Sequence, residues 1–295
     1  MKKLLILSGK GGTGKTTTSA SFIQFAQARA FADCDVDAPN LHLVQAVEGE
    51  PEAFDYLGSE KASIDLELCT GCGACADACR FGAIRKDGDR CRVDPYACEG
   101  CGVCAYVCPQ KAVELHEDVA GQVLLYQGKQ TFSTAHLRTG RGNSGKLVSE
   151  VKLALFKHAP QADLAILDGS PGIGCPVISS ISGADLVLVV TEPSLSGLSD
   201  LERVLRTAAG FQAKTAVCVN KADLSPAHAD EIEAFCREHQ VPFLGRVPYD
   251  RRASEAINAG KSLAEVGGPA CEALREIFDG AMALLAEPQR DPLDA

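Results

Sequence analysis

The sequence predicts an α/β protein with a mostly parallel sheet, helices on both faces of that sheet, and a small α+β domain inserted into the chain. Short apolar runs alternate with helical patterns over most of the 295 residues, which is typical of parallel sheets covered by helices. Eight of the 14 cysteines fall in one short stretch, in two copies of the same spacing. A chain of this length accommodates one large and one small domain.

The expected elements of the larger domain follow the hydrophobic pattern. Short apolar runs indicate buried strands, and apolar residues at helical spacing indicate helices. Strands are expected at residues 4–7, 29–32, 165–167, 185–190, 215–219 and 243–245, and helices at 17–28, 197–209, 226–238 and 269–286. We assign residues 1–61 and 117–295 to this discontinuous domain and residues 62–116 to the insert.

Composition and charge indicate which partners are disfavoured and in which cellular compartment the protein is expected. The chain is 46% hydrophobic and 23% charged, an ordinary globular composition, and its net charge is −10. This charge disfavours nucleic acid and anionic membranes as partners. No apolar run approaches the roughly 20 residues that a membrane span needs, and the first apolar run stops at Ser8, too short for an export signal. We expect a cytoplasmic protein whose cysteines stay reduced.

Two cysteine runs share the pattern C-x2-C-x2-C-x3-C. Thiolates at this spacing hold iron–sulfur clusters, and residues 62–116 resemble a bacterial ferredoxin with two 4Fe–4S clusters. In such proteins the fourth cysteine of each run binds the other cluster. The resemblance therefore implies Cys69, Cys72, Cys75 and Cys108 for cluster 1, and Cys98, Cys101, Cys104 and Cys79 for cluster 2.

Zinc and disulfides are the alternatives for these cysteines. Zinc sites usually combine two C-x2-C pairs into one four-thiolate site, which the longer runs suit poorly. Disulfides need an oxidising compartment, for which the sequence gives no sign. Cys91 lies between the two runs, and we interpret it as a small core residue.

A phosphate-binding loop follows the first expected strand. Residues 9–16, GKGGTGKT, satisfy the pattern G-x4-G-K-[ST], in which backbone amides at a helix start surround phosphate groups. We expect Lys15 to contact the β and γ phosphates and the hydroxyl of Thr16 to coordinate Mg²⁺. The predicted nucleotide-binding residues of this segment are Gly11, Gly12, Thr13, Gly14, Lys15, Thr16 and Thr17.

Lys10 adds a second lysine to this loop. The string KGGTGKTT resembles the deviant Walker A motif of the MinD/ParA superfamily of ATPases, to which the nitrogenase iron protein is also related. The resemblance covers nearly all of the chain outside the insert. It implies a nucleotide-dependent homodimer, or a heterodimer with a related ATPase, in which Lys10 reaches the phosphates of the partner. The alternative is a solvated loop lysine.

Acidic residues follow two of the expected strands. The segment beginning at Asp33 resembles switch I of this family, and we favour Asp35, with Asp37 as the reserve, as the carboxylate that orients the attacking water. We expect Asp33 to support magnesium or the loop. Asp168 follows residues 165–167 as a Walker B aspartate does and is expected to hold Mg²⁺ through water; the alternative is a strand-capping aspartate.

Cys175 and residues 140–146 are two further features that the family resemblance bears on. Cys175 stands at the spacing from Asp168 at which the nitrogenase iron protein has a cluster ligand, but residues 140–146 contain no second cysteine. A metal site shared by two Cys175 thiols and a packing cysteine therefore both stay open. No strand is visible before residues 140–146, and we interpret them as a loop that senses nucleotide or contacts a partner.

The base pocket is expected at the ends of the last two strands. Asn220 and Asp223 belong to an N-K-x-D string, which selects guanine in GTPases, whereas in MinD-like proteins the asparagine contacts adenine. The resemblance favours ATP, with GTP as the alternative. Pro248 and Tyr249 are expected to border the same pocket.

These features together resemble MinD-superfamily ATPases that contain an inserted ferredoxin domain. The leading hypothesis is a slow or partner-dependent ATPase that couples switching and dimerisation to electron transfer or metallocluster assembly, with a redox or metallocluster protein as partner. A cluster scaffold and a non-catalytic nucleotide switch are the alternatives. Residues 287–292 do not resemble the basic membrane-binding tail of MinD, so neither membrane nor nucleic acid is expected as partner.

Overall fold

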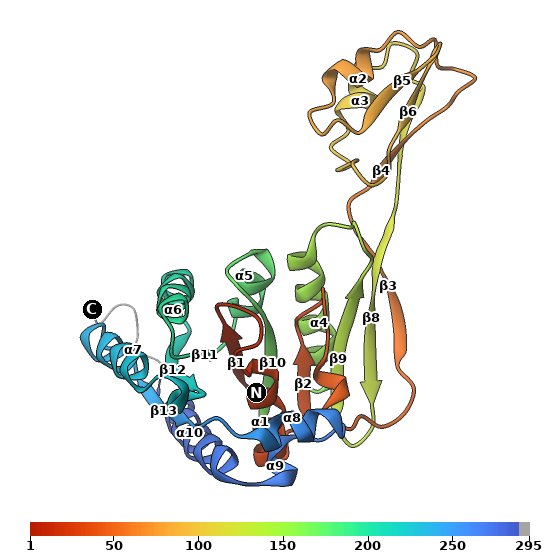
Figure 1. The fold of residues 1–295 in the computed structure, drawn as a ribbon. Helices are drawn as coiled ribbons and strands as arrows, with labels where there is room; N and C mark the ends of the chain where they lie inside the picture. The colour runs from red at the N-terminus through yellow and green to blue at the C-terminus, as the bar shows by residue number, and fades with distance from the viewer. Residues whose placement is uncertain (289–295) are drawn as a thin grey trace. The chain divides into compact units, whose positions relative to one another are not determined.

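The computed structural model describes residues 1–288, and a nine-stranded sheet organises most of them. Its strands are β1 (Lys2–Ser8), β2 (Ala30–Asp33), β3 (Glu52–Leu57), β8 (Val119–Gln127), β9 (Thr131–Leu137), β10 (Leu164–Pro171), β11 (Leu186–Thr191), β12 (Lys214–Asn220) and β13 (Phe243–Val247). The strand order is β13-β12-β11-β1-β10-β2-β9-β8-β3 (Figure 1).

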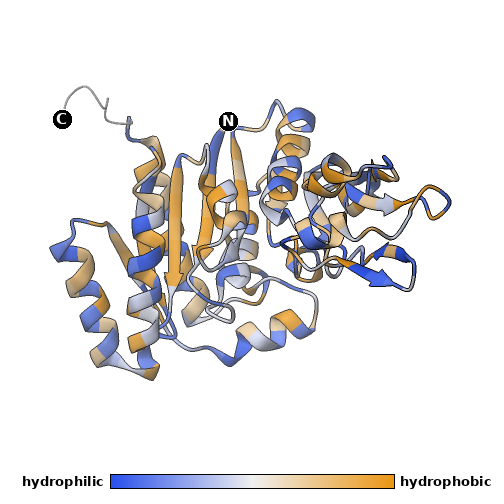
Figure 2. Ribbon diagram, turned by 90° about the horizontal axis from the view of Figure 1, so that it is seen from above, coloured by the Kyte–Doolittle hydropathy of each residue, from blue (hydrophilic) through white to orange (hydrophobic). Residues whose placement is uncertain are grey.

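The predicted parallel sheet is confirmed. β1 pairs in parallel with both β10 and β11, and the parallel pairing continues through β12 to β13 on one side and through β2 to β9 on the other. Leu4, Leu5, Ile6 and Leu7 of β1 are fully buried, because both faces of a parallel sheet are covered. Figure 2 shows hydrophobic residues along the strands of the sheet.

Helices cover both faces of the sheet. They are α1 (Lys15–Ala26), α4 (Ser144–His158), α5 (Cys175–Ile181), α6 (Leu195–Ala208), α7 (Pro226–Glu238), α8 (Arg251–Asn258), α9 (Leu263–Val266) and α10 (Pro269–Ala286), with 3-10 turns η1 (Leu41–Leu43) and η2 (Ala222–Leu224). α1 contacts α9 and α10, whereas α4 contacts α5 and α5 contacts α6, so the two groups form separate layers (Figure 1). Phe22 and Phe278 meet edge to face at 5.1 Å between α1 and α10.

Element boundaries differ from the prediction in two places that matter for function. β2 runs one residue further than expected, so that Asp33 is its last residue and pairs in register with Asp168 of β10. No strand is visible in the sequence before residues 140–146, but in the structure β9 ends at Leu137. β9 contains the buried polar residues Ser133 and Thr134, which interrupt the apolar run by which a parallel strand is recognised.

The chain divides into two compact units. The larger contains Met1–Ala53, Val123–His136 and residues 144–288, and the smaller contains Phe54–Gln122 and Leu137–Asn143. The smaller unit therefore extends on both sides beyond the predicted insert of residues 62–116.

Short elements build the smaller unit. They are β4 (Lys61–Ile64), α2 (Ala74–Ala78), β5 (Ile84–Asp87), β6 (Arg90–Val93), α3 (Val103–Val107) and β7 (Val113–His116). β4 pairs antiparallel with β7, and β5 pairs antiparallel with β6. The core of this unit is formed largely by cysteines and small aliphatic side chains.

Two expectations concern membranes. Within residues 1–288, no helix is both long and apolar enough to cross a bilayer. The interpretation of residues 287–292 as unlike a membrane-binding tail falls mainly on residues 289–292, which lie outside the described part of the chain.

Candidate functional site

The loop between β1 and α1 forms a backbone cradle. Gly12 and Gly14 have φ angles of 80° and 93°, which glycine adopts without strain. A Cβ atom on Gly14 would lie 2.1 Å from Nδ2 of Asn220, so a side chain here would clash. Gly14 is the N-cap of α1, and the first turn of that helix carries no acidic residue. Backbone amides at such a helix start favour an anion, as the predicted phosphate-binding residues Gly11–Thr17 require.

Lys15 and Asp168 form a buried ion pair at the start of α1. Nζ of Lys15 lies 2.8 Å from Oδ1 of Asp168, and their side chains are 7% and 0% exposed. The same carboxylate accepts hydrogen bonds from Oγ1 of Thr16 at 2.8 Å and from Oγ of Ser19 at 2.7 Å. Burial disfavours the charge on Lys15, but the adjacent carboxylate outweighs it and raises the pKa of the ammonium group. Sequence reasoning missed Ser19, which stands one helical turn after Lys15.

Asp33 holds the loop that follows β2. Its Oδ1 accepts the amide of Asp35 at 3.0 Å, and its Oδ2 accepts the amides of Asn40 at 2.8 Å and Leu41 at 2.9 Å. Burial, followed by the nearby charge of Asp168, raises the pKa of Asp33 to about 7. The carboxylate thereby fixes the loop that carries the predicted water-orienting residues.

The other two aspartates of this loop differ in exposure. Asp35 is half-buried, and desolvation raises the pKa of its carboxyl to about 6. Asp37 is exposed. The hydroxyl of Thr16 lies 3.0 Å from Oδ1 of Asn40, so this loop reaches the predicted magnesium-binding threonine.

Lys10 contacts residues of its own chain. Its Nζ lies 3.2 Å from Oε2 of Glu192 and 3.3 Å from Oγ of Ser196. The other carboxylate oxygen of Glu192 lies 2.6 Å from Nζ of Lys221, which also donates to the carbonyl of Gly12 at 3.0 Å. Burial alone would raise the pKa of Glu192, but the two lysines outweigh it and lower that pKa. Glu192 therefore links both lysines to the loop between β11 and α6.

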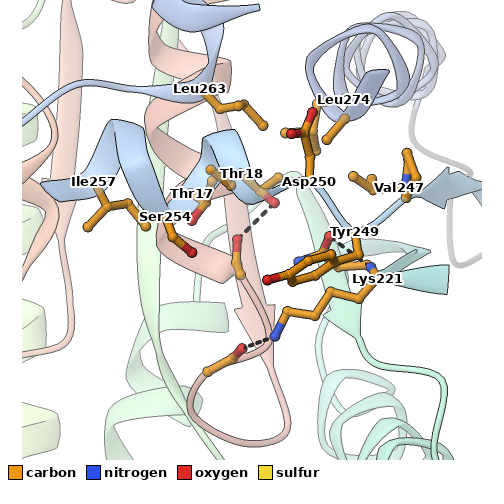
Figure 3. Close-up of a pocket in the computed structure, with 16 residues that line it drawn as sticks. Thr17, Thr18, Lys221, Val247, Tyr249, Asp250, Ser254, Ile257, Leu263 and Leu274 are labelled. Atoms are coloured by element: carbon orange, nitrogen blue, oxygen red, sulfur yellow. Dashed lines mark hydrogen bonds between the residues drawn. The ribbon is translucent and has the colours of Figure 1, made fainter. Parts of the chain in front are cut away.

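A pocket opens between the phosphate loop and the residues that follow β13 (Figure 3). Asn220, Pro248 and Tyr249 line it as predicted residues, together with Gly12, Gly14 and Thr17. Thr18, Lys221, Val247, Asp250, Ala253, Ser254, Ile257, Leu263, Ala270 and Leu274 complete the lining. The contributions of α8, α9 and α10 were not predicted, because no local motif marks these ordinary helical residues.

Asn220 and Asp223 have different positions at this pocket. Nδ2 of Asn220 donates to the carbonyl of Thr13 at 2.8 Å, beside the pocket. Asp223 is not among the lining residues, and its Oδ1 accepts the amide of Tyr249 at 2.6 Å. The carboxylate thus holds the segment after β13 in place.

The eight cysteines of the two C-x2-C-x2-C-x3-C runs belong to the smaller unit and line two separate cavities. Cys69, Cys72, Cys75 and Cys108 line one, and Cys79, Cys98, Cys101 and Cys104 line the other. Each cavity therefore takes three cysteines from one run and the fourth from the other run. Within residues 1–288, no three His, Cys, Asp or Glu side chains converge on one point where a single metal ion could sit.

Glycines and backbone amides shape these cavities. Gly71 and Gly100 have φ angles of 66° and 67°, and a Cβ on either would overlap a carbonyl oxygen at 2.2 Å or less. Amides donate to three of the sulfurs at 3.3–3.4 Å, namely Gly71 to Cys69, Ala112 to Cys108 and Ala62 to Cys98. Hydrogen bonds from the backbone amides of Gly71 and of Cys91 are the leading causes of a lowered pKa at Cys69.

Cys175 is an exposed cysteine of the larger unit. It is the first residue of α5, and α4 approaches it through Gly145, where a Cβ would lie 3.0 Å from Cβ of Cys175. Residues 144 and 145 of the predicted sensing loop therefore lie beside Cys175. Lys152 of α4 donates to the carbonyls of Ser179, Ser180 and Ser182 at the end of α5, which fixes this helix pair.

The phosphate cradle, the Lys15–Asp168 pair and their place at the carboxyl ends of parallel strands define a P-loop nucleotide-binding protein. The family model described as "CobQ/CobB/MinD/ParA nucleotide binding domain" matches residues 4–263, and the chain belongs to this family.

Relatives and solved structures agree with this assignment. The chain is 34% identical over 251 residues to the uncharacterized protein MJ0578 of Methanocaldococcus jannaschii, covering 83% of this chain and 86% of the relative. It is 24% identical over 310 residues to a protein of Drosophila pseudoobscura pseudoobscura named cytosolic Fe-S cluster assembly factor Nubp1 homolog, with coverage of 95% and 81%. The cell division ATPase MinD of Pyrococcus furiosus shares the fold, with 19% identity, a TM-score of 0.56 and coverage of 96% and 99%.

Proposed function

We propose that this chain is an ATP-hydrolysing iron–sulfur protein that couples nucleotide-dependent switching to electron transfer or metallocluster assembly. One observation carries the proposal: two cavities, each lined by one predicted set of four cysteines, belong to a unit that interrupts a MinD/ParA-type nucleotide-binding chain. The proposal has three parts, which concern the clusters, the nucleotide and the link between them.

The first part is that each cavity holds a 4Fe–4S cluster. Iron–sulfur clusters take thiolates as ligands, and each cavity is lined by one predicted set of four cysteines. Backbone amides donate hydrogen bonds to the sulfurs of Cys69, Cys98 and Cys108, as groups around metal-binding side chains commonly do. The glycines let the backbone pass close to the cavities. These features support a ferredoxin-like unit with cluster 1 and cluster 2 as the cysteine spacing predicts.

The second part is that the larger unit binds and hydrolyses ATP. A relative named "Uncharacterized ATP-binding protein MJ0547" is 24% identical over 280 residues. The carboxylate of Asp223 accepts the amide of Tyr249. This contact supports adenine over guanine, because an aspartate that selects guanine must accept hydrogen bonds from the base. Thr16 and Asp168 would hold Mg²⁺, which supplies positive charge to the phosphates. Lys15 would bind the phosphates, and the half-buried Asp35 would orient water.

The third part is the link between nucleotide and clusters. The smaller unit enters the chain after the Asp33–Asn40 loop and leaves it before Asp168, so it lies in sequence between the two segments that contact the predicted magnesium site. Loops that contact γ-phosphate and magnesium change conformation on hydrolysis. We propose that this change, in a cytoplasmic homodimer or a heterodimer with a related ATPase, controls the access of a redox or metallocluster partner to the clusters.

The second candidate function is that of a scaffold, which hands a cluster or metal to other proteins. The name of the Drosophila relatives, "Cytosolic Fe-S cluster assembly factor Nubp1 homolog", favours it. An assembly factor needs a cluster or metal that it can release, and the exposed Cys175 offers a thiol outside the two cavities. In electron transfer, by contrast, the metal stays bound throughout the cycle.

Metal analysis with a chelator challenge tests the proposal and separates the two candidates. Anaerobically purified protein should contain about eight iron and eight sulfide ions per chain, and Cys72→Ser should lose about half of each. Hydrolysis of ATP should be lost in Lys15→Ala with the iron content unchanged. If a chelator removes iron only from protein with Cys175 intact, and Cys175→Ser resists, assembly is supported. Protein that contains zinc, or no metal, overturns the proposal.

A further inference from the structure

The smaller unit repeats one arrangement around its two cavities. The amide of Asp65 donates to the carbonyl of Ala112 at 2.8 Å, and the amide of Asp94 donates to the carbonyl of Ala83 at 2.7 Å. These aspartates precede Cys69 and Cys98, the first cysteine of each run, by the same number of residues. The two halves of the unit are therefore structural counterparts.

Cys91 and Ala62 occupy the same place in the two halves. The amide of Ala62 donates to Sγ of Cys98 at 3.4 Å, and Ala62 and Cys91 stand the same number of residues before the matched aspartates Asp65 and Asp94. Cluster 1 would therefore have a thiol at a position where cluster 2 has a methyl group. This difference distinguishes two otherwise similar cavities.

The side chain of Cys91 is directed toward cluster 1. It is 1% exposed and lines the cavity together with the four cysteines of that set. It is buried in the same small core as Cys75, and Cys69 packs against that core. The interpretation of Cys91 as a mere core residue therefore omitted its contact with two predicted cluster ligands, which only the folded structure brings together.

We propose that the Cys91 thiol donates a hydrogen bond to the ligand sulfurs of cluster 1 and sets that cluster at a higher reduction potential than cluster 2. The inference rests on the proposed function, because it requires both clusters to be present. A thiol is a weak donor, and hydrogen bonds to cluster sulfurs are among the factors that set the potential. Such a bond favours the reduced cluster because that form is more negative, whereas the methyl group of Ala62 can donate none. The first electron added to the chain then resides on cluster 1.

Redox titration of the full chain, followed anaerobically by EPR, tests this inference. In Cys91→Ala, the ratio of reduced to oxidised cluster 1 at fixed potential should fall about tenfold, as loss of one hydrogen bond to a charged group implies, which equals a shift of about 59 mV. Cluster 2 should not change. Cys91→Ser keeps a hydroxyl donor and should keep the high potential. Ala62→Cys should raise the potential of cluster 2 instead.

Iron content makes the outcomes distinguishable. Wild-type protein without clusters contradicts the proposed function itself. Clusters at full occupancy whose potentials do not move in Cys91→Ala overturn the inference alone. If Cys91→Ala loses iron, the potential of cluster 2 in Ala62→Cys tests the inference instead, because that variant leaves cluster 1 intact. An unchanged potential of cluster 2 in a fully loaded Ala62→Cys protein then overturns the donor role.

Discussion

Nζ of Lys15 lies 2.8 Å from Oδ1 of Asp168, and this ion pair is buried at the centre of the phosphate-binding site. A buried charge is tolerated only where a partner compensates it. Asp168 is also the residue to which Thr16 and Ser19 donate. In the nucleotide-free chain, the groups expected to bind phosphate and magnesium therefore stabilise one another.

Substitution of Asp168 by asparagine should destabilise the nucleotide-free protein. The change removes the carboxylate that is paired with the buried ammonium group of Lys15, so we expect a loss of about 3 kcal/mol in the free energy of unfolding. Urea unfolding of wild type and variant measures it. Glu202→Gln is the matched control, because Glu202 pairs at 2.6 Å with Arg206 on an exposed helix face and should cost less than about 1 kcal/mol. Equal losses in the two variants would contradict the role given to the buried pair.

Stability of the metal-free and nucleotide-free protein should fall as the pH rises from about 4 to 7. The pKa of Asp33 is raised to about 7 by burial and by Asp168, so the folded state holds its proton at pH values where the unfolded state has lost it. Asp35 contributes in the same direction up to about pH 6. Between pH 5 and 6 the Asp33 contribution should approach a loss of about 1.4 kcal/mol per pH unit, and the slope should decline as the pH nears 7; Asp33→Asn should remove this contribution.

Unfolding curves at several pH values check this expectation. Asp37→Asn is the control on the same loop, because Asp37 is exposed, and it should keep the wild-type slope. The same slope in wild type and in Asp33→Asn would show that Asp33 is not the titrating group.

Base selectivity should not depend on the charge of Asp223. Its carboxylate accepts the amide of Tyr249, and the amide oxygen of asparagine can accept the same bond. We therefore expect Asp223→Asn to bind ATP with an affinity within about threefold of wild type and to keep its preference over GTP. Competition binding with fluorescent nucleotides measures both. If wild type binds GTP tightly and Asp223→Asn binds it much more weakly, Asp223 recognises guanine.

Much of the nucleotide site can be predicted from the sequence, because the residues that form it are neighbours in the chain. The glycines of the phosphate loop, Lys15 and Thr16 stand next to one another in the chain, and backbone geometry alone requires their spacing. The cysteine runs are equally local, and the two sets that the resemblance to bacterial ferredoxins implies line two separate cavities.

Other features depend on contacts between segments that are distant in sequence. Glu192 meets Lys10 only because β11 lies beside β1, and Cys91 meets Cys69 only because β6 folds back on the first cysteine run. Strand β9 escaped prediction because buried serine and threonine replace aliphatic residues within it. No local pattern marks such positions as part of a site.

Glu192 should restrain dimer formation by holding Lys10 in its own chain. The contact is a half-exposed ion pair, which contributes at most about 1 kcal/mol. Glu192→Gln should therefore strengthen the ATP-dependent dimer by up to about fivefold, and Lys10→Ala should abolish it. Sedimentation with and without ATP measures the dissociation constant.

Charge alone could also alter association, so Glu202→Gln on α6 serves as the control for the same change of charge. It should leave the dimer unaffected. A monomeric Glu192→Gln protein, or an unaltered Lys10→Ala dimer, would contradict the role given to the Lys10–Glu192 contact.

Nucleotide binding should alter the clusters, and EPR of the reduced protein with and without Mg-ATP can detect this change. We predict two cluster signals whose potentials or spin coupling shift when Mg-ATP is added. The shift should be absent in Lys15→Ala protein that retains its iron. Two ferredoxin-type signals that do not respond to nucleotide in the wild-type protein would contradict the coupling between the two units.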